Sequence, residues 1–401
     1  MYRTNVLRDL PFHMVGVSHH TAGIGVREQF AFEPPELDAL LACEREAGRY
    51  ALLLYTCNRC ELYWSGADEY EGWFRDLAEA RGVSLADELV RRDGAAAVRH
   101  LFLVTAGLDS QVLGETEILG QVRRAYDAAR AAGTTSREMD MIFSCALSTG
   151  RRIRRETALG RHPASVSSAA VDVAAQEYGG AIGSRSVLVL GAGEAAEGVL
   201  RSLHLGGASR VALVNRNPDR ARMLATAWGA SAHAWSELDA LLPAAELLFV
   251  ATGASRPAVS AAQLAQALEG RADPLVTMDL SVPRNVEPEA RHLPGVRLYD
   301  LDDLQRLCCP AAGTAAAALH DAEMMMNEEL ARLEQQLRGL AAAPRLAELH
   351  RHGAEVAEQE AAWALAQLEE LSEHQRMVVR EMANRLVRRV LYPVSRSIRE
   401  E

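Results

Sequence analysis

The segment SVLVLGAGEAAEGVLRSLHLGG, residues 186–207, constrains the fold of this chain more than any other stretch. A short apolar run typical of a buried strand is followed at once by a glycine turn and then by a helical pattern. RVALVNR at 210–216 predicts a second strand, and LLFVATG and PLVTMDLSVPR predict further buried strands between helical stretches. Strands that alternate with helices in this way predict a parallel, doubly wound sheet.

The glycine turn in this segment predicts a dinucleotide site of the Rossmann type. Gly191 allows a tight turn, Gly193 lets the backbone approach a pyrophosphate, and Ala196 lets helix and strand pack closely. The pyrophosphate is expected at the N-terminus of the helix, where free amides and the helix dipole favour an anion. The predicted cofactor-binding residues of this turn are Gly191, Ala192, Gly193, Glu194, Ala195 and Ala196.

The end of the second strand selects between the two nicotinamide cofactors. An NAD enzyme carries Asp or Glu there to hold the ribose 2′-hydroxyl, whereas this strand ends in Asn215 and Arg216. Arginine attracts a 2′-phosphate that a carboxylate would repel. We therefore predict NADPH as the cofactor, with a solvated surface side chain as the alternative interpretation of Arg216.

Two further regions flank the nucleotide-binding pattern. Up to about residue 150, strand-like runs such as HMVGVSH, YALLLYT and CELYWSG mix with helical ones, which predicts an N-terminal α+β domain. From about residue 313, apolar residues three and four apart predict helices that pack on partner helices. We expect Pro344 to break or kink the first helix. Two further amphipathic stretches are expected at Leu365–Leu371 and Met382–Leu391. The chain is thus a multidomain α/β protein, with domains at 1–160, 161–305 and 306–401.

The helical tail has two possible uses. Three helices with long apolar seams and little else make a poor independent core, so dimerisation is favoured. A cap folded back on the same chain is the alternative.

Composition excludes several kinds of chemistry. The 43 basic residues are all arginine, because the chain contains no lysine, and this excludes Schiff-base chemistry and a lysine-containing phosphate loop. The net charge of −11 argues against a general nucleic-acid binder but leaves room for a local basic face. The N-terminal segment lacks the pattern of a secretory signal and no run approaches the length of a membrane span, so we expect a cytoplasmic protein with reduced cysteines.

The stretch LLLYTCNRCELYW, residues 52–64, places Cys57 and Cys60 around an Asn-Arg pair. A structural zinc site needs about four ligands, and a thioredoxin-like pair usually opens a helix, whereas this pair lies between two strand-like runs. A single nucleophile at Cys57 and two buried structural thiols are the interpretations that remain. Arg59 is expected either to favour the thiolate or to hold a substrate carboxylate.

A thiol nucleophile beside an NADPH domain suggests a particular reaction. The thiolate would attack an activated carboxyl group to give a thioester, which hydride transfer would then reduce to an aldehyde. Because the two domains must bring the nicotinamide to Cys57, a hinge between them is expected.

These motifs, taken in order, resemble the glutamyl-tRNA reductase family over nearly the whole chain. The resemblance is carried by VGVSHHTAGIGVREQFAF, TCNRCELY, VRHLFLVTAGLDSQVLGETEILGQVRRAY, SVSSAAVDVA, VLVLGAGE, VNRNPDRA, VATGASRP and DLSVPRNVEP, and by the helical tail. It implies NADPH-dependent reduction of glutamyl-tRNA to glutamate-1-semialdehyde through a cysteine thioester, with release of tRNA, as the first step of five-carbon-route tetrapyrrole (porphyrin) biosynthesis. It also implies a V-shaped homodimer and a transient complex with glutamate-1-semialdehyde aminomutase.

The resemblance also assigns roles to individual residues. It implies that Cys57 and His100 are catalytic, with His100 transferring a proton to the departing ribose oxygen or to the reduced intermediate. The implied substrate contacts are Thr56, Asn58, Arg59, Ser110, Glu115, Thr116, Glu117 and Gln121. Arg59 would grip the glutamyl side-chain carboxylate in a bidentate manner.

The chain departs from the family pattern at two positions near these residues. The family usually has Gln where Glu117 stands, and a carboxylate there should repel the substrate unless it is protonated, paired or turned away. Cys60 replaces a residue that is not normally a thiol, which allows an inactivating disulfide with Cys57 under oxidation. No metal ligand set is predicted.

Two other functions remain open. One is an NADP-dependent dehydrogenase of a small hydroxy acid, resembling shikimate dehydrogenase, which leaves the cysteine turn and the helical tail unexplained. The other is a non-catalytic tRNA-binding regulator, against which Cys57, Arg59, His100 and the glycine turn argue. Arginine clusters at 151–155 and 385–396 are candidates for phosphate contacts, with solvated helix faces as the alternative.

Overall fold

The computed structural model describes residues 7–85, 87–111, 113–115, 117–157, 159, 165–180, 182–307, 312–368 and 370–400. The chain folds as two compact units. One unit is Pro11–Met326, and the other contains Asn327–Glu401 together with the N-terminal residues up to Leu10.

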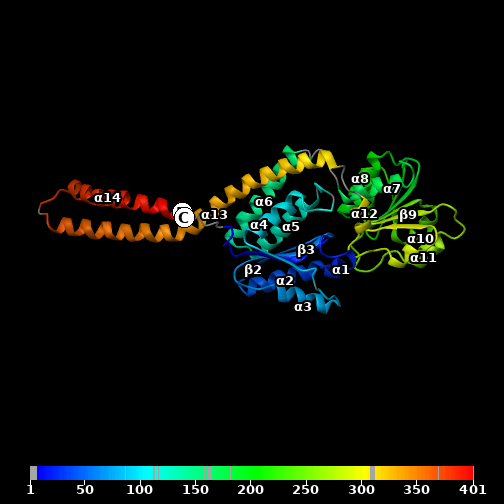
Figure 1. Ribbon diagram of the computed structural model, residues 1–401, viewed down its shortest axis with the longest axis horizontal. Helices are drawn as coiled ribbons and strands as arrows, with labels where there is room; N and C mark the ends of the chain where they lie inside the picture. The colour runs from blue at the N-terminus through cyan, green and yellow to red at the C-terminus, as the bar shows by residue number, and fades with distance from the viewer. Residues whose placement is uncertain are drawn as a thin grey trace. The chain divides into compact units, whose positions relative to one another are not determined.

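The first part of the larger unit is the predicted α+β domain. Its antiparallel sheet has the order β2-β3-β1-β4, with β1 at Phe12–Ser18, β2 at Tyr50–Tyr55, β3 at Arg59–Ser65 and β4 at Val90–Asp93 (Figure 1). Its helices are α1 (Ile24–Arg27), α2 (Pro34–Glu46), α3 (Glu71–Ala80), α4 (Ala95–Ala106), α5 (Glu117–Ala132) and α6 (Arg137–Glu156). The three strands predicted from sequence are confirmed to within one residue at each end.

Alternation along β3 sends its side chains to two different environments. Leu62 and Trp64 enter an apolar cluster with Phe74 of α3. On the opposite face, Tyr63 packs edge-on against Phe143 of α6 at 5.7 Å between ring centroids. Arg59 and Glu61 share this second face, so β3 aims its charged side chains at α4 and the loop that follows it.

The second part of the larger unit is the predicted parallel sheet. Its order is β10-β9-β8-β5-β6-β7, and every neighbouring pair is parallel. The strands are β5 (Ser186–Leu190), β6 (Arg210–Asn215), β7 (Ser231–Ala234), β8 (Leu247–Val250), β9 (Leu275–Asp279) and β10 (Val296–Tyr299). The helices are α7 (Val166–Gln176), α8 (Glu194–Leu205), α9 (Pro218–Trp228), α10 (Leu238–Leu241), α11 (Ala261–Ala267) and α12 (Leu301–Leu307).

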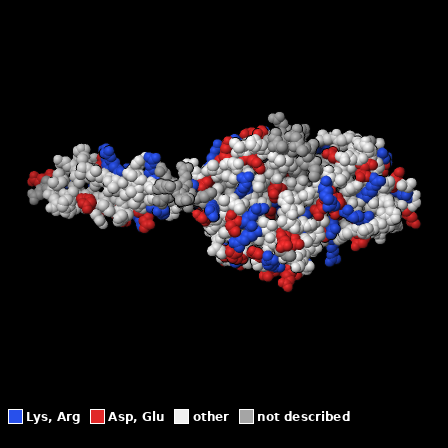
Figure 2. Space-filling view, in the orientation of Figure 1, with Lys and Arg blue, Asp and Glu red and all other residues white. Residues whose placement is uncertain are grey.

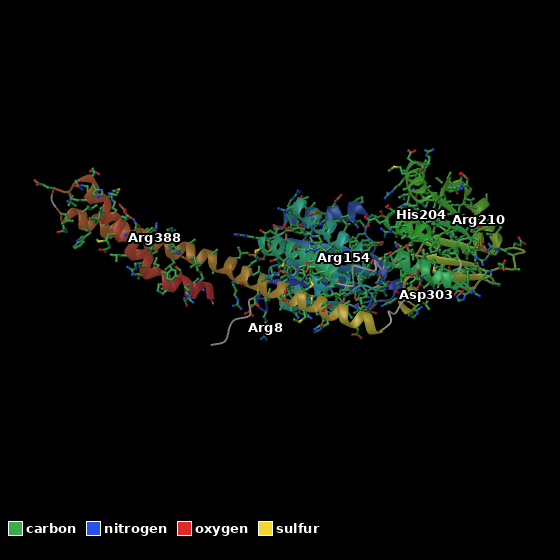
Figure 3. All side chains as sticks on the ribbon, turned by 90° about the horizontal axis from the view of Figure 1, so that it is seen from above. Arg8, Arg154, His204, Arg210, Asp303 and Arg388 are labelled. Atoms are coloured by element: carbon green, nitrogen blue, oxygen red, sulfur yellow. The ribbon has the colours of Figure 1, made fainter. Side chains whose placement is uncertain are left out.

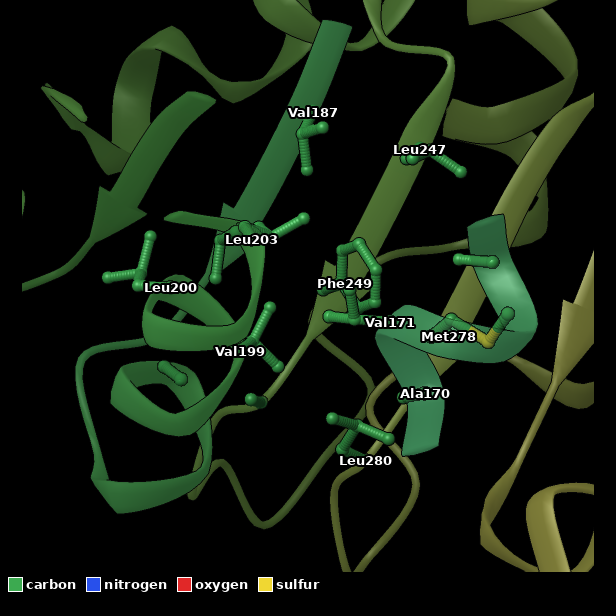
Figure 4. Packing of buried hydrophobic residues seen from close by; sticks show 14 of the residues in the cluster. Ala170, Val171, Val187, Val199, Leu200, Leu203, Leu247, Phe249, Met278 and Leu280 are labelled. Carbon is green, nitrogen blue, oxygen red and sulfur yellow. The ribbon is translucent and has the colours of Figure 1, made fainter. Parts of the chain in front are cut away.

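Apolar side chains cover both faces of this sheet. We call the cluster that joins β5, β8 and β9 to α7 and α8 the nucleotide-domain cluster; it contains Val187, Phe249, Met278, Ala170 and Val199 (Figure 4). The strand order reverses between β5 and β8. A parallel sheet opens a ligand crevice at such a reversal, beyond the carboxyl ends of its strands.

The smaller unit is a pair of long helices, and it corrects two details of the sequence prediction. Helix α13 (Ala312–Ala366) begins in the larger unit and continues through Pro344, which is therefore not a break. Pro344 is exposed, so the helix loses one hydrogen bond there without burying an unpaired carbonyl. Leu365–Leu371 is not a helix of its own, because α13 ends at Ala366 and α14 (Glu373–Glu400) begins after a short connection.

Small residues allow α13 and α14 to approach closely. A Cβ atom at Gly353 would lie 2.5 Å from a methyl group of Leu391. Ala357 and Ala361, one and two turns further along α13, are buried. In contrast, several large apolar side chains of these two helices are exposed: Trp363, Met377, Met382, Leu386, Val390 and Tyr392. Among the described helices, none is long and apolar enough to cross a membrane.

Candidate active site

The cysteine turn is a tight connection between β2 and β3. The backbone N–H of Thr56 donates to the carbonyl of Arg59 at 2.9 Å, which closes the turn. The hydroxyl oxygen of Thr56 accepts from the N–H groups of Asn58 at 3.1 Å and Arg59 at 3.2 Å. The carbonyl of Asn58 accepts from the N–H of His19 at 2.9 Å. Thr56 and Asn58 thus hold the turn that presents Cys57, and the Asn58 side-chain oxygen is buried without a partner among the described residues.

Arg59 is buried in a network of charges rather than facing solvent. Its Nη1 atom donates to Glu61 at 2.8 Å and to Asp109 at 2.9 Å, and Nη2 donates to the carbonyl of Asp109. The arginine and Glu61 are 1% and 2% exposed. A charge-assisted network this deep fixes the guanidinium in one place. Neither Glu61 nor Asp109 was predicted from the sequence, although the two-residue spacing of Arg59 and Glu61 places both side chains on one face of a strand.

His100 belongs to the same network. Its Nε2 atom lies 2.9 Å from Oε1 of Glu61, and Tyr63 donates to the other oxygen of Glu61 at 2.7 Å. Burial alone would raise the pKa of Glu61, but Arg59 and then His100 hold it well below its usual range. Glu61 is therefore an ionised carboxylate that orients both predicted functional residues.

A cavity of about 270 Å³ opens onto this network from the β1–β4 side of the sheet. Glu61, His100 and Asp109 line it, together with His20, whose Nε2 atom lies 3.3 Å from Asp109. Both ring nitrogens of the neighbouring His19 are buried, and neither has a hydrogen-bond partner among the described residues. Burial, followed by the charge of His20, lowers the pKa of His19 to about 3, so this ring is neutral.

Cys57 lies where the turn meets the nucleotide-binding part of the chain. Its side chain packs against the nucleotide-domain cluster, whereas Cys60 packs beneath the sheet with Leu62 and Trp64. Both are free thiols. Although Cys57 keeps some exposed surface, burial, followed by Glu115 and Glu117, raises its pKa to about 12. Cys57 is therefore protonated in this structure.

Arg27 is a cation that acts on the pKa of Cys57, a role that the sequence offered to Arg59 as one of two alternatives. Arg27 favours the thiolate, and its Nε atom donates to the Cys57 carbonyl at 3.4 Å. Its terminal nitrogens donate to the carbonyl of Ala22 at 2.8 Å and to Asp302 of α12 at 2.9 Å. The arginine thus ties the cysteine turn to both α1 and α12. The motif GVREQF contained this residue, but nothing in the sequence placed it beside Cys57.

Of the other predicted substrate contacts, Glu115 and Glu117 lie close enough to Cys57 to affect its pKa. Burial, followed by the charge of Glu117, raises the pKa of Glu115 to about 7. The Ser110 hydroxyl lies near enough to Glu115 to lower that pKa, although it does not reach hydrogen-bond geometry with any described group. Thr116 lies outside the described residues.

Glu117 points toward the nucleotide-binding part of the chain. One of its oxygens lies 3.5 Å from where a Cβ atom of Gly198 would be. Burial, followed by the charge of Glu194, raises the pKa of Glu117. The orientation of Glu117 toward Gly198 and its raised pKa both reduce the repulsion that a carboxylate at this position would exert on the substrate carboxylate. Gln121, one turn further along α5, lines a separate cavity discussed below.

The predicted cofactor residues line a cavity of about 350 Å³ at the carboxyl edge of the parallel sheet. Gly191, Ala192, Gly193, Asn215 and Arg216 all contribute to it, with Arg220, Trp235 and residues 251–254. A Cβ atom at Gly191 would lie 2.1 Å from the carbonyl of Ala251, and its φ of +109° favours glycine. Gly193 precedes α8 and faces open space, which leaves room for a pyrophosphate at the helix N-terminus.

The other three residues of the glycine turn begin α8. Ala196 is fully buried in the nucleotide-domain cluster, as its predicted packing role requires. The carbonyl of Ala195 accepts from the Ser167 hydroxyl at 3.0 Å. Glu194 accepts two hydrogen bonds from Arg124 of α5, at 2.7 and 2.9 Å. This pair, like Arg27 with Asp302, joins the α+β domain to the nucleotide domain.

The fold and the two cavities define a class of protein: an oxidoreductase with a dinucleotide-binding sheet beside a domain that presents a cysteine. Residues 15–157 match the model of the glutamyl-tRNAGlu reductase N-terminal domain, and residues 321–401 match that of its dimerisation domain. Residues 172–307 match the shikimate / quinate 5-dehydrogenase model. The alternative function, a hydroxy-acid dehydrogenase, therefore explains only residues 172–307 and leaves the two flanking regions unexplained.

Individual relatives agree with this assignment. A glutamyl-tRNA reductase of Deinococcus radiodurans is 41% identical over 325 residues, covering 80% of this chain and 91% of that protein. Glutamyl-tRNA reductase 2 of Anaeromyxobacter dehalogenans is 36% identical over 97% of this chain and 87% of its own length. The solved glutamyl-tRNA reductase of Methanopyrus kandleri is 30% identical, covers 97% of this chain and 98% of its own, and has a TM-score of 0.49. The relatives of 41% and 36% identity show that the chain belongs to the glutamyl-tRNA reductase family.

The arginine clusters named as candidates for phosphate contacts lie in both units. Figure 3 labels Arg154 on α6 and Arg388 on α14. Arg154 already has a partner within the protein, because its Nη2 atom donates a hydrogen bond to the carbonyl of Glu115 at 2.6 Å. Figure 2 shows basic and acidic side chains interspersed over the face that it draws. Contacts with a polyanion on this face would therefore be local.

Proposed function

We propose that this protein reduces glutamyl-tRNA with NADPH to glutamate-1-semialdehyde and releases tRNA, as the first step of tetrapyrrole biosynthesis. One observation carries the proposal. The Cys57 side chain packs against the nucleotide-domain cluster, so a thiol and a dinucleotide cavity occur in one compact unit. The names of the relatives support the same substrate.

Cys57 is the proposed nucleophile. Its sulfur attacks the ester carbonyl of the glutamyl group, a C–S bond forms, the ester C–O bond breaks, and the ribose oxygen leaves with a proton. Because the pKa of Cys57 is about 12, the thiol must lose its proton after the substrate binds. Glu115, with a pKa of about 7, is the nearby carboxyl group best suited to accept this proton at neutral pH.

His100 and Arg59 have proposed roles that their shared partner Glu61 supports. Glu61 holds the Nε2 side of His100, which fixes the ring for proton transfer to the ribose oxygen or to the reduced intermediate. Arg59 is proposed to bind the glutamyl side-chain carboxylate. That carboxylate would replace Asp109 on the guanidinium, and Asp109 would keep its contact with His20.

The residues present fit NADPH. When bound, NADPH supplies the hydride that converts the thioester to the aldehyde. Gly193 leaves space at the helix N-terminus for the pyrophosphate, and Arg216 and Arg220 line the same cavity where a 2′-phosphate would lie. The guanidinium of Arg216 lies 5.2 Å from the ring centroid of Trp235, which orders this arginine.

The remaining features concern assembly. We propose a homodimer formed through α13 and α14, whose exposed apolar side chains are uncovered in the single chain. A cytoplasmic location and a transient complex with glutamate-1-semialdehyde aminomutase complete the proposal, and the complex rests on the resemblance to the family.

The function is tested by incubating the protein with glutamyl-tRNA and NADPH and measuring glutamate-1-semialdehyde. The wild type and Cys43→Ser, whose exposed thiol lies outside the site, should both form the aldehyde. Cys57→Ser should form none. Turnover of a small hydroxy acid without tRNA, or aldehyde formation by Cys57→Ser, would contradict the proposal.

A further inference from the structure

A cavity separate from the two described so far runs beside the edge strand β2, between α2 and α5. We call it the leucine groove. It has a volume of about 280 Å³ and is lined by Leu37, Leu40, Leu41, Leu53, Tyr55, Gln121, Arg124, Ala125 and Ala128. Figure 1 shows α2 and α5 on opposite sides of β2, and each of them contacts that strand.

One end of the leucine groove lies next to the cysteine turn. Tyr55 is the last residue of β2 and precedes Cys57 by two positions, about 7 Å along an extended chain. Gln121 is on the first turns of α5, the helix that begins at Glu117, whose charge acts on Cys57. The groove therefore begins close to the nucleophile and leads away from it along α5.

The lining of the groove is mostly apolar but includes polar groups. Leucine and alanine side chains form most of it, and Tyr55, Gln121 and Arg124 add hydrogen-bonding groups. The Tyr55 hydroxyl lies 3.5 Å from the carbonyl of Val282, and its ring packs against Phe32 at 6.0 Å between centroids. The tyrosine is held by these contacts, so its ring is a fixed wall and not a mobile cover.

These observations favour one kind of occupant. The lining favours an occupant that is largely apolar with polar edges, and the volume of about 280 Å³, just below the roughly 300–1,000 Å³ of typical ligand pockets, requires a small one. A purine base has this form: apolar and aromatic side chains bind its faces, and a glutamine amide reads the edge of adenine. Exposed Arg123 of α5 supplies positive charge for the adjoining phosphate.

We propose that the leucine groove binds the 3′-terminal adenosine of glutamyl-tRNA, with Tyr55 and Gln121 contacting the base; the inference rests on the proposed function. In an aminoacyl-adenosine only the ribose separates the ester carbonyl from the base. When the carbonyl is at the Cys57 sulfur, the base must therefore lie within one sugar of the turn. The leucine groove begins at that distance and would position the ester for attack.

The test compares two acyl donors with the full-length protein in the absence of NADPH. The 3′-O-glutamyl ester of adenosine carries the base, and the glutamyl thioester of N-acetylcysteamine does not. The rate at which Cys57 becomes glutamylated is followed by intact mass. Ala125→Phe places a ring in the groove, and Ala131→Phe places the same ring on the exposed side of α5.

We expect Ala125→Phe to slow glutamylation by the adenosine ester about tenfold or more, the scale of one lost base contact. Glutamylation by the small thioester should stay within about twofold of the wild type, since this donor makes no base contact. Ala131→Phe should match the wild type with both donors. Equal slowing with both donors, or no slowing with either, would overturn the groove assignment while leaving the proposed function intact.

A second measurement needs no variant. Wild-type protein is given glutamyl-tRNA whose terminal nucleotide lacks its base, and glutamylation should again fall about tenfold or more relative to the intact tRNA. An unchanged rate would overturn the groove assignment. If neither intact glutamyl-tRNA nor the small thioester glutamylates Cys57, the proposed function itself fails, and the groove proposal fails with it.

Discussion

The Nε2 atom of His100 lies 2.9 Å from Oε1 of Glu61, the same oxygen that accepts a hydrogen bond from Arg59 at 2.8 Å. One buried carboxylate thus joins the residue proposed to transfer protons to the residue proposed to bind the substrate carboxylate. Neither side chain can move without disturbing the charge balance of the other. Glu61 is a positioning residue for both.

Replacing Glu61 tests this relationship. Glu61→Gln keeps the shape of the side chain but removes the charge that compensates Arg59. We expect the free energy of unfolding to fall by about 3 kcal/mol, because a buried charge loses one of its partners. Glu156→Gln, which breaks exposed pairs with Arg152 and Arg155, should have a much smaller effect. Urea unfolding of both variants checks the prediction. Similar losses of unfolding free energy would show that the Glu61 network stabilises the fold no more than an exposed ion pair does.

The raised pKa of Cys57 predicts low reactivity in the free protein. With a pKa of about 12, very little thiolate exists at pH 8, and the thiolate is the reactive form. We expect iodoacetamide to modify exposed Cys43 much faster than Cys57, as measured by peptide mapping over time at pH 8. The rate at Cys57 should keep rising up to pH 10. A plateau in that rate below pH 8 would mean that the thiolate already forms in the free enzyme.

Glu115 should make stability depend on pH. Its pKa of about 7 in the folded chain exceeds the ordinary value of 4.5, so the folded state holds this proton more tightly than the unfolded state does. Its contribution to stability is complete below the ordinary pKa and is lost as pH rises through 7, on the order of 3 kcal/mol in total. Glu115→Gln should therefore be more stable than the wild type at pH 8 and not at pH 4. Exposed Glu269→Gln is the control, and thermal unfolding at the two pH values is the measurement.

The cofactor cavity predicts which arginines select NADPH. Arg220→Ala removes a cation that lines the cavity and should raise the KM for NADPH about tenfold, with little change for NADH. Arg222→Ala, on the same helix, removes a cation that pairs with Asp219 at the surface and should leave both values unchanged. Equal effects of Arg220→Ala on NADPH and NADH would place the 2′-phosphate elsewhere.

The sequence predicted the features that depend on local pattern. The glycine turn, the parallel sheet and the strands around Cys57 each follow from neighbouring residues, and the structure confirms them. Pro344 was harder to interpret, because a proline disfavours a helix locally but is tolerated where the surrounding turns are stable and exposed.

Features that depend on contacts between distant residues were not predictable. Arg59 and Asp109 are 50 residues apart in sequence, and Arg27 and Asp302 are 275 apart. No spacing rule joins such pairs, so the burial of Arg59 and the effect of Arg27 on Cys57 required the fold. The leucine groove is a similar case, because its leucines are typical core residues in sequence and only the packing of α2 and α5 leaves space between them.

The central claim is that Cys57 forms a glutamyl thioester, and intact mass tests it most directly. The full-length protein is mixed with glutamyl-tRNA without NADPH, and peptide mapping then locates any added mass. The account predicts one glutamyl group on Cys57, which disappears as glutamate-1-semialdehyde forms when NADPH is added. An unmodified Cys57 together with aldehyde formation in the complete mixture, or a glutamyl group on a different residue, would contradict it.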